Sequence, residues 1–213
     1  YGAASYQATV CASDTRAWNQ PTSVGASDFV SQITQWSLDN WGEDVLANRR
    51  GGAIYYWKTT VGTAPRAVLV TNSPTTVNSI VVSPNDRHLI ALGTNEFGTT
   101  ASPSGTYNPM VVRWSDQEDY TNWTPAINST SGEVIIADGT KIVGARRSRN
   151  AVNIWTDNAL WSMTFVGPPF IFNFAQLGTN CGLIAQHAAV DYDGRSVWMG
   201  YDNFYVFDGQ VRS

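Results

Sequence analysis

The amino-acid sequence predicts an all-β fold, and three observations support that prediction. Short runs of β-branched and aromatic residues recur along the 213 residues. Stretches that contain Asn, Asp and Gly, such as DYDGR and FDGQ, separate these runs and favour tight turns. Helical signals are weak, because only residues 26–39 combine a Ser/Asp cap with apolar residues at mixed spacing.

The individual strands are predicted from apolar runs with turn residues on both sides. In chain order they cover residues 53–57, 66–70, 79–83, 88–92, 110–114, 133–137, 151–155 and 196–200. The weak helical pattern over residues 26–39 is the one exception.

The stretch 36–57, WSLDNWGEDVLANRRGGAIYYW, is unusually rich in aromatic residues. We interpret its start as a fixed corner in which indole N–H groups and a carboxylate satisfy the loop backbone. This corner consists of Trp36, Asp39, Asn40 and Trp41. Gly51 and Gly52 favour a tight turn or bulge with positive φ. The strand that follows is expected to place Ile54, Tyr55 and Trp57 in the core.

Internal repetition narrows the fold class. Residues 150–163 and 195–208 match at an offset of about 45 residues, and each unit reads as a strand, an Asp-Asn turn and a second strand. Earlier in the chain, the runs around Ile54 and Leu89 share an apolar strand pattern at a step of 35 residues. Residues 94–109 are interpreted as an insertion that lengthens the distance to the next repeat. The spacing predicts a β-propeller with about four visible blades, and we expect that the ring needs further sequence or other elements to close. A β-sandwich is the alternative.

The domain organisation follows from this pattern. Residues 1–35 are expected to be a partly irregular entry segment, and residues 36–213 the β-propeller region of a longer protein.

Composition limits the function classes. Charged residues make up only 14% of the chain and aromatic residues 12%, with nine Trp, which predicts a neutral, aromatic surface that favours partner binding. The net charge of -4 argues against bulk attraction to nucleic acid or anionic membranes. No apolar run approaches the roughly 18 residues of a membrane span, so we expect no membrane insertion by this region.

Four blocks resemble a known family. Residues 36–57, 111–125 (VVRWSDQEDYTNWTP), 141–172 and 197–209 (VWMGYDNFYVFDG) are similar, in this order, to the central region of tail proteins of tailed bacteriophages. The resemblance is greatest to nozzle or hub proteins of short-tailed phages, some of which are described as DNA-stabilisation proteins, and it spans most of the chain.

The resemblance implies a β-propeller structural subunit of the virion tail. It implies a homo-oligomer, a hexamer, that lies below the portal and its adaptor, surrounds the DNA exit channel, and connects to tail fibres or spikes. Under this interpretation the chain is no enzyme and needs no cofactor, and its contact with genomic DNA is transient.

Two groups of residues are the candidate contact sites. The arginines could meet DNA phosphates in a channel. Alternatively, they are solvated hairpin ends, or they pair between subunits with carboxylates such as Glu43 and Asp44. These arginines are Arg49, Arg50, Arg146, Arg147 and Arg149. The block FVGPPFIFNF could form an apolar belt against another subunit, or pack within the monomer. Its candidate interface residues are Phe165, Pro168, Pro169, Phe170 and Phe172.

Catalytic signals are weak. His88 and His187 lie in strand and turn contexts and are expected to be hydrogen-bonded structural residues. Ser115, Asp119 and Trp123 loosely resemble the structural Asp-box of sialidase-like propellers, and the nearby acidic residues lack the spacing of a calcium loop. No catalytic, cofactor-binding or metal site is therefore assigned. A glycan-binding propeller module and a sialidase-like hydrolase remain alternative functions.

Overall fold

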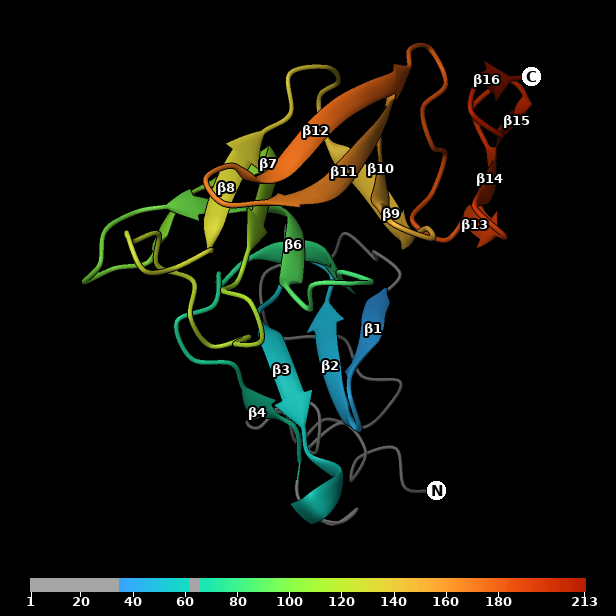
Figure 1. Cartoon of the computed structure of the whole chain (residues 1–213). Helices are drawn as coiled ribbons and strands as arrows, with labels where there is room; N and C mark the ends of the chain where they lie inside the picture. Colours follow the sequence, from blue (N-terminus) through green and yellow to red (C-terminus); the bar gives the residue numbers. More distant parts are fainter. Residues whose placement is uncertain (1–34, 62–65) are drawn as a thin grey trace, which may run out of the picture. The chain divides into compact units, whose positions relative to one another are not determined.

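Four antiparallel sheets of four strands each make up the part of the protein that the structure describes (Figure 1). The computed structural model describes residues 35–61 and 66–213, and the only helix in this part of the chain is a short 3-10 turn, η2 (Thr59–Val61). Within the same residues, no helix is long and apolar enough to cross a membrane. The all-β prediction is confirmed.

Each sheet is an open meander in which strands consecutive in the chain are hydrogen-bonded neighbours. Sheet 1 contains β1 (Trp36–Trp41), β2 (Asp44–Arg49), β3 (Ile54–Trp57) and β4 (Val68–Leu69). Sheet 2 contains β5 (Val77–Val82), β6 (Leu89–Phe97), β7 (Ser104–Trp114) and β8 (Gly132–Ile135). Sheet 3 contains β9 (Ile142–Arg147), β10 (Val152–Thr156), β11 (Leu160–Gly167) and β12 (Ile171–Gly178). Sheet 4 contains β13 (Ala189–Tyr192), β14 (Arg195–Met199), β15 (Phe204–Phe207) and β16 (Val211–Arg212).

Every strand predicted from an apolar run is present, because each overlaps one of β3 to β8, β10 or β14. The expected insertion at residues 94–109 is instead the extension of β6 and β7 into one long hairpin. Backbone pairing continues through polar residues there, so the local sequence alone did not indicate it.

The predicted corner at residues 36–41 is wrong, as is the helical pattern where it reaches residues 36–39. These residues form β1, which pairs along its whole length with β2, from Trp36 opposite Arg49 to Trp41 opposite Asp44. Gly42 supplies the positive φ of 66° at the turn between them. The rest of the helical pattern and nearly all of the entry segment 1–35 lie outside the described residues.

The turn after β2 is confirmed, since Gly51 has a φ of 73°. The core assignment of the next strand is confirmed only in part. Ile54 is fully buried, whereas Tyr55 is 37% exposed because it lies on the opposite face of the same strand. Trp57 is half-buried.

Apolar side chains pack the sheets together in chain order. Leu46 and Ile54 of sheet 1 cluster with Ile80 and Leu89 of sheet 2. The opposite face of sheet 2 packs on sheet 3, with side chains that include Ile90, Val112, Ile154 and Met163. The opposite face of sheet 3 packs on sheet 4, where the rings of Trp155 and Trp198 meet edge to face at 5.6 Å. Sheets 2 and 3 are thus covered on both faces, which explains why all residues of β10 are buried.

Prediction: replacing Ile154, which is fully buried between sheets 2 and 3, should destabilise the whole array. For Ile154→Ala we expect the free energy of unfolding to fall by about 2–5 kcal/mol, because the change leaves a cavity between two sheets. Chemical denaturation monitored by tryptophan fluorescence measures this value. The control Ile127→Ala removes the same atoms from a fully exposed side chain, and it should change the stability by less than about 0.5 kcal/mol.

Candidate functional site

The carboxylate of Asp39 joins the first strands of three sheets. Asp39 lies on β1, and its side chain is only 8% exposed. Its Oδ2 accepts a hydrogen bond from the Val82 N–H of β5 at 2.7 Å, and its Oδ1 lies 2.8 Å from a guanidinium nitrogen of Arg147 on β9. A carboxylate removed from water needs such donors, so this residue fixes the relative positions of the three strands.

The segment that leads into β13 completes this arrangement. Gln186 is buried and donates from Nε2 to Ser37 Oγ of β1 at 2.7 Å. Arg146 of β9 donates from Nε to the Ala189 carbonyl at 2.9 Å, and from another guanidinium nitrogen to His187 Nδ1 at 3.2 Å. The beginnings of all four sheets are therefore linked through polar side chains.

A cavity of about 250 Å³ lies among these residues. We call it the first-strand cavity, and its lining combines polar groups from sheets 1, 2 and 3 and from the segment before β13 with a few apolar ones. The lining residues are Ser37, Leu38, Ser79, Ile80, Ala145, Arg146, Gln186 and His187. Burial lowers the pKa of the Arg146 guanidinium, and main-chain carbonyl oxygens take up most of its donors. The cavity can thus hold a small polar molecule, but most donors of Arg146 already bond to main-chain carbonyl oxygens and are not free to bind it.

The predicted arginine clusters lie on different sheets. Arg49 and Arg50 are exposed at the turn after β2, where Arg50 donates to Gln35 Oε1 at 2.8 Å. The second cluster lies at the β9–β10 hairpin. Arg147 there pairs with Asp39, and Arg149 pairs with Asp193 at 2.6 Å, with both side chains of this second pair largely exposed.

These positions divide the five arginines by what they can do. Arg146, Arg147 and Arg149 all contribute to links between sheets, and of the five only Arg146 is not exposed. Contact with DNA or another subunit stays a prediction for all five. Sialidase-like chemistry would need three arginines around one substrate carboxylate, and Arg113 is instead buried within sheet 2, bonded to carbonyl oxygens that include that of Trp123.

The phenylalanine–proline block contains both residues that pack inside the monomer and residues that are exposed at a turn. Phe172 is buried between sheets 2 and 3, and Phe165 packs against it with ring centroids 5.7 Å apart. Pro168, Pro169 and Phe170 form the turn between β11 and β12 and are exposed, Phe170 by 79%. Packing within the monomer accounts for the first two residues, and an interface at the turn remains a prediction.

Sequence reasoning missed two exposed apolar surfaces, which lie on the end sheets. The outer face of sheet 1 carries Leu38 and Tyr55, and the outer face of sheet 4 carries Val190, Val197 and Phe204. A sheet with one solvated face alternates apolar and polar residues. Sheet 4 instead places apolar residues on both faces, as in Ala189-Val190 and Val197-Trp198, and that lack of alternation was the signal available in the sequence.

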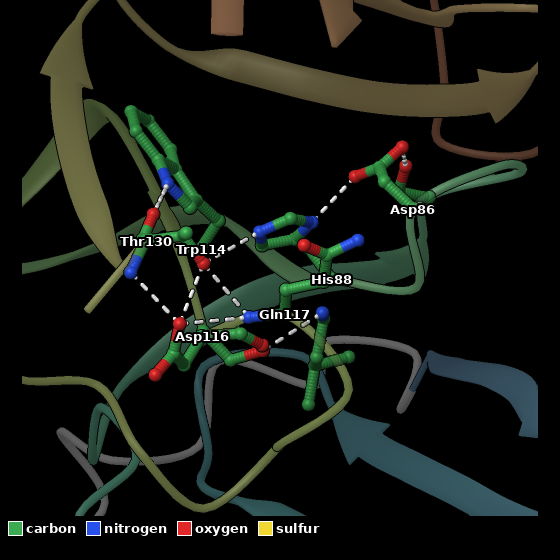
Figure 2. A network of polar contacts seen from close by, with 9 residues as sticks. Asp86, His88, Trp114, Asp116, Gln117 and Thr130 are labelled. Carbon is green, nitrogen blue, oxygen red and sulfur yellow. Dashed lines mark hydrogen bonds and ion pairs between the residues drawn. The ribbon is translucent and has the colours of Figure 1, made fainter. Parts of the chain in front are cut away.

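One network around the buried His88 superficially resembles a catalytic relay (Figure 2). The His88 ring lies between Asp86, at 2.5 Å from Nδ1, and the Thr130 hydroxyl, at 3.0 Å from Nε2. This hydroxyl also contacts Asp116 Oδ1 at 2.5 Å and accepts a hydrogen bond from the Gln117 N–H.

The geometry of this network favours a structural role. A nucleophilic hydroxyl must direct its proton to the imidazole, whereas Thr130 directs its proton to Asp116. His88 is fully buried, and its ring packs on Phe172 at 5.0 Å. The structure thus gives His88 the hydrogen-bonded setting that was predicted for it, and His187, although exposed, accepts from Arg146.

The acidic loop after β7 is held by the same network. Burial by itself would raise the pKa of Asp116, but hydrogen bonds from Thr130, Gln117 and Asn122 outweigh it and hold that pKa below its ordinary value. Of the Asp-box-like residues, Ser115 accepts from the Leu89 N–H, and the buried Trp123 donates to the Tyr120 carbonyl. Among the residues that the structure describes, no three potential metal ligands cluster.

Comparison with known proteins adds no family assignment. No protein-family model matches the chain, and no curated protein matches it significantly. The resemblance to phage tail proteins therefore stays a prediction, and function is argued from the surfaces described above.

Prediction: Thr130→Val keeps the side-chain shape but removes the hydroxyl at the centre of the network. We expect a loss of about 1–3 kcal/mol in the free energy of unfolding, because buried polar groups lose their partner. Urea denaturation measures the loss. The matched control Thr100→Val lies at an exposed position and should be nearly neutral. Equal stability of both variants would contradict the structural role.

Prediction: the contribution of Asp116 to stability should depend on pH. A carboxyl group whose pKa is lowered in the folded state stabilises that state above its unfolded pKa of about 4, and the stabilisation disappears as pH falls through the folded pKa. Asp116→Asn should therefore be less stable than the wild type at pH 7, and the difference should shrink towards pH 2. A difference that is the same at both pH values would contradict this assignment.

Proposed function

We propose that the protein is a structural subunit of a bacteriophage tail, part of the nozzle or hub that surrounds the DNA exit channel. In this role it forms a homo-oligomeric ring, contacts the portal-side adaptor and distal tail parts, and lies in the virion. The observation that carries the proposal is the pair of exposed apolar outer faces on sheets 1 and 4. Exposed apolar surfaces are typical of protein–protein contacts, although ligand-binding grooves share this property.

The sheet arrangement supports a β-propeller as the underlying fold. Propeller blades are four-stranded meanders whose first strands surround a common axis. The Asp39 contacts bring β1, β5 and β9 together, and Gln186 adds the entry to β13. A two-layer sandwich accounts less well for three successive apolar interfaces.

Charge is compatible with a conduit for DNA. The net charge of -4 gives little general attraction to phosphate, while exposed arginines such as Arg49 and Arg149 offer only local contacts. Each tight phosphate contact adds affinity, so a channel that must release DNA benefits from few of them.

A glycan-binding module is the second candidate, because aromatic side chains are exposed on sheet 4 and its β14–β15 turn. Phe204 is 70% exposed, Tyr192 81% and Tyr201 63%. Such rings can stack on sugars, but they serve equally as anchors in protein interfaces.

Prediction: the purified chain should assemble into rings. Mass photometry over a concentration series should show one discrete oligomer of about six copies, and negative-stain images should show rings. A monomer at every concentration would contradict assembly by this chain. Specific sugar binding by that monomer in a glycan screen, lost in Tyr192→Ala, would then establish the second candidate.

A further inference from the structure

We propose that copies of this chain join head to tail, with the outer face of sheet 4 packed on the outer face of sheet 1 of a second copy. The inference rests on the proposed function in so far as both require assembly, and it adds the two surfaces that meet. Three features of the structure support it: the direction of the internal packing, the composition of the two faces, and the charges beside them.

The internal packing has a fixed direction. For each sheet, we call the face towards the next sheet in chain order the leading face, and the opposite one the trailing face. Sheets 2 and 3 each use their two opposite faces for their two neighbours, so the stacking follows the order of the sheets in the chain. Within sheet 2, for example, Ile80 belongs to the trailing face and Val81 to the leading face, in agreement with strand alternation.

Among residues 35–61 and 66–213, two faces have no neighbouring sheet: the leading face of sheet 4 and the trailing face of sheet 1. Every interface within the chain joins one leading face to one trailing face, and these two free faces could form another interface of the same type. A contact between them is heterologous, so it continues from copy to copy and closes into a ring when the rotation permits. Contacts between two copies of the same face would instead give an isologous dimer.

Both free faces carry an apolar row across their middle, with charged residues towards the edges, such as Arg49 on sheet 1 and Arg195 and Arg212 on sheet 4. On sheet 4, Val190, Val197 and Val206 form one continuous cross-strand row. On sheet 1, the corresponding row is Leu38, Ala47, Tyr55 and Leu69. These rows place apolar side chains where a solvated sheet would carry polar ones.

The exposed residues of each face present an area that approaches that of a stable contact. Phe204 is 70% exposed, Tyr192 81% and Leu38 67%. A large aromatic side chain covers about 150–250 Å² when fully buried, so the exposed residues of each face together present several hundred Å². Stable interfaces bury about 800 Å² on each partner, which is the same order.

Charges at the hairpin tips agree with the same arrangement. Within the chain, the first hairpins of consecutive sheets touch: Arg87 lies over the Trp41 ring at 5.9 Å, and Arg149 pairs with Asp193. The series would continue with Arg195, exposed at the β13–β14 hairpin, and Glu43, exposed at the β1–β2 hairpin of the next copy. These two residues carry opposite charges.

Cross-linking between single-cysteine variants tests the contact. Leu38→Cys marks the trailing face of sheet 1 and Val190→Cys the leading face of sheet 4, each at a side chain that is more than half exposed. Both are made in a Cys11→Ser background. Cys181 is kept, because it is buried and that burial raises the pKa of its thiol, which slows its reaction. Stacked sheets lie about 10 Å apart, so a bismaleimide of that span is the probe.

The expected result is a cross-linked dimer band that forms at least tenfold more in the mixture of the two variants than in either variant alone. A matched control mixes Val190→Cys with Ile127→Cys, whose position is fully exposed but far from both faces in the sequence and on neither of them, and should give no enrichment.

Other outcomes overturn the inference in distinguishable ways. Equal cross-linking of Val190→Cys with itself would show an isologous contact. Intact rings without cross-linking in the mixture would show that other surfaces join the copies, and the proposed function would stand. If the wild type is monomeric and the mixture shows no cross-linking, both the proposed ring assembly and the proposed contact between sheets 4 and 1 are contradicted.

Discussion

A sheet that is apolar on both faces requires a neighbour on each face, and this requirement determines most of the structure. Sheets 2 and 3 meet it within the chain, so their central strands, such as β10, are buried throughout. Sheets 1 and 4 meet it on one face only. The hydrophobic effect that orders the sheets therefore leaves two apolar surfaces, on sheets 1 and 4, whose burial on assembly would be favourable.

Polar residues set the positions that apolar packing leaves open. Apolar faces can slide over one another at little cost, whereas a carboxylate with little exposure tolerates few arrangements of its donors. Asp39 contacts β5 and β9, and the buried Asn153 on β10 donates to Ser196 on β14 at 2.8 Å. The Thr130 network does the same for the loop after β7. These contacts account for buried groups that would otherwise suggest catalysis.

The sequence predicted those strands in which apolar runs are flanked by turn residues, and it failed where other forces decide. Residues 36–41 form a strand because β2 pairs with them, and no local pattern contains that information. Among the candidate site residues, exposed Arg149 could be recognised as a surface charge, whereas the commitment of Arg146 to distant carbonyl oxygens depends on the fold. The missing alternation in sheet 4 was visible, but only the structure shows which of its two faces is covered.

The central claim is that the outer faces of sheets 1 and 4 become buried when copies assemble. Hydroxyl-radical footprinting with mass spectrometry tests it directly, through the reactivity of individual side chains in dilute and in concentrated samples. The account predicts strong protection of Tyr192, Phe204 and Leu38 on assembly, while Phe170 at the β11–β12 turn, 79% exposed, stays reactive. Unchanged reactivity of the first three side chains in an assembled sample would contradict it.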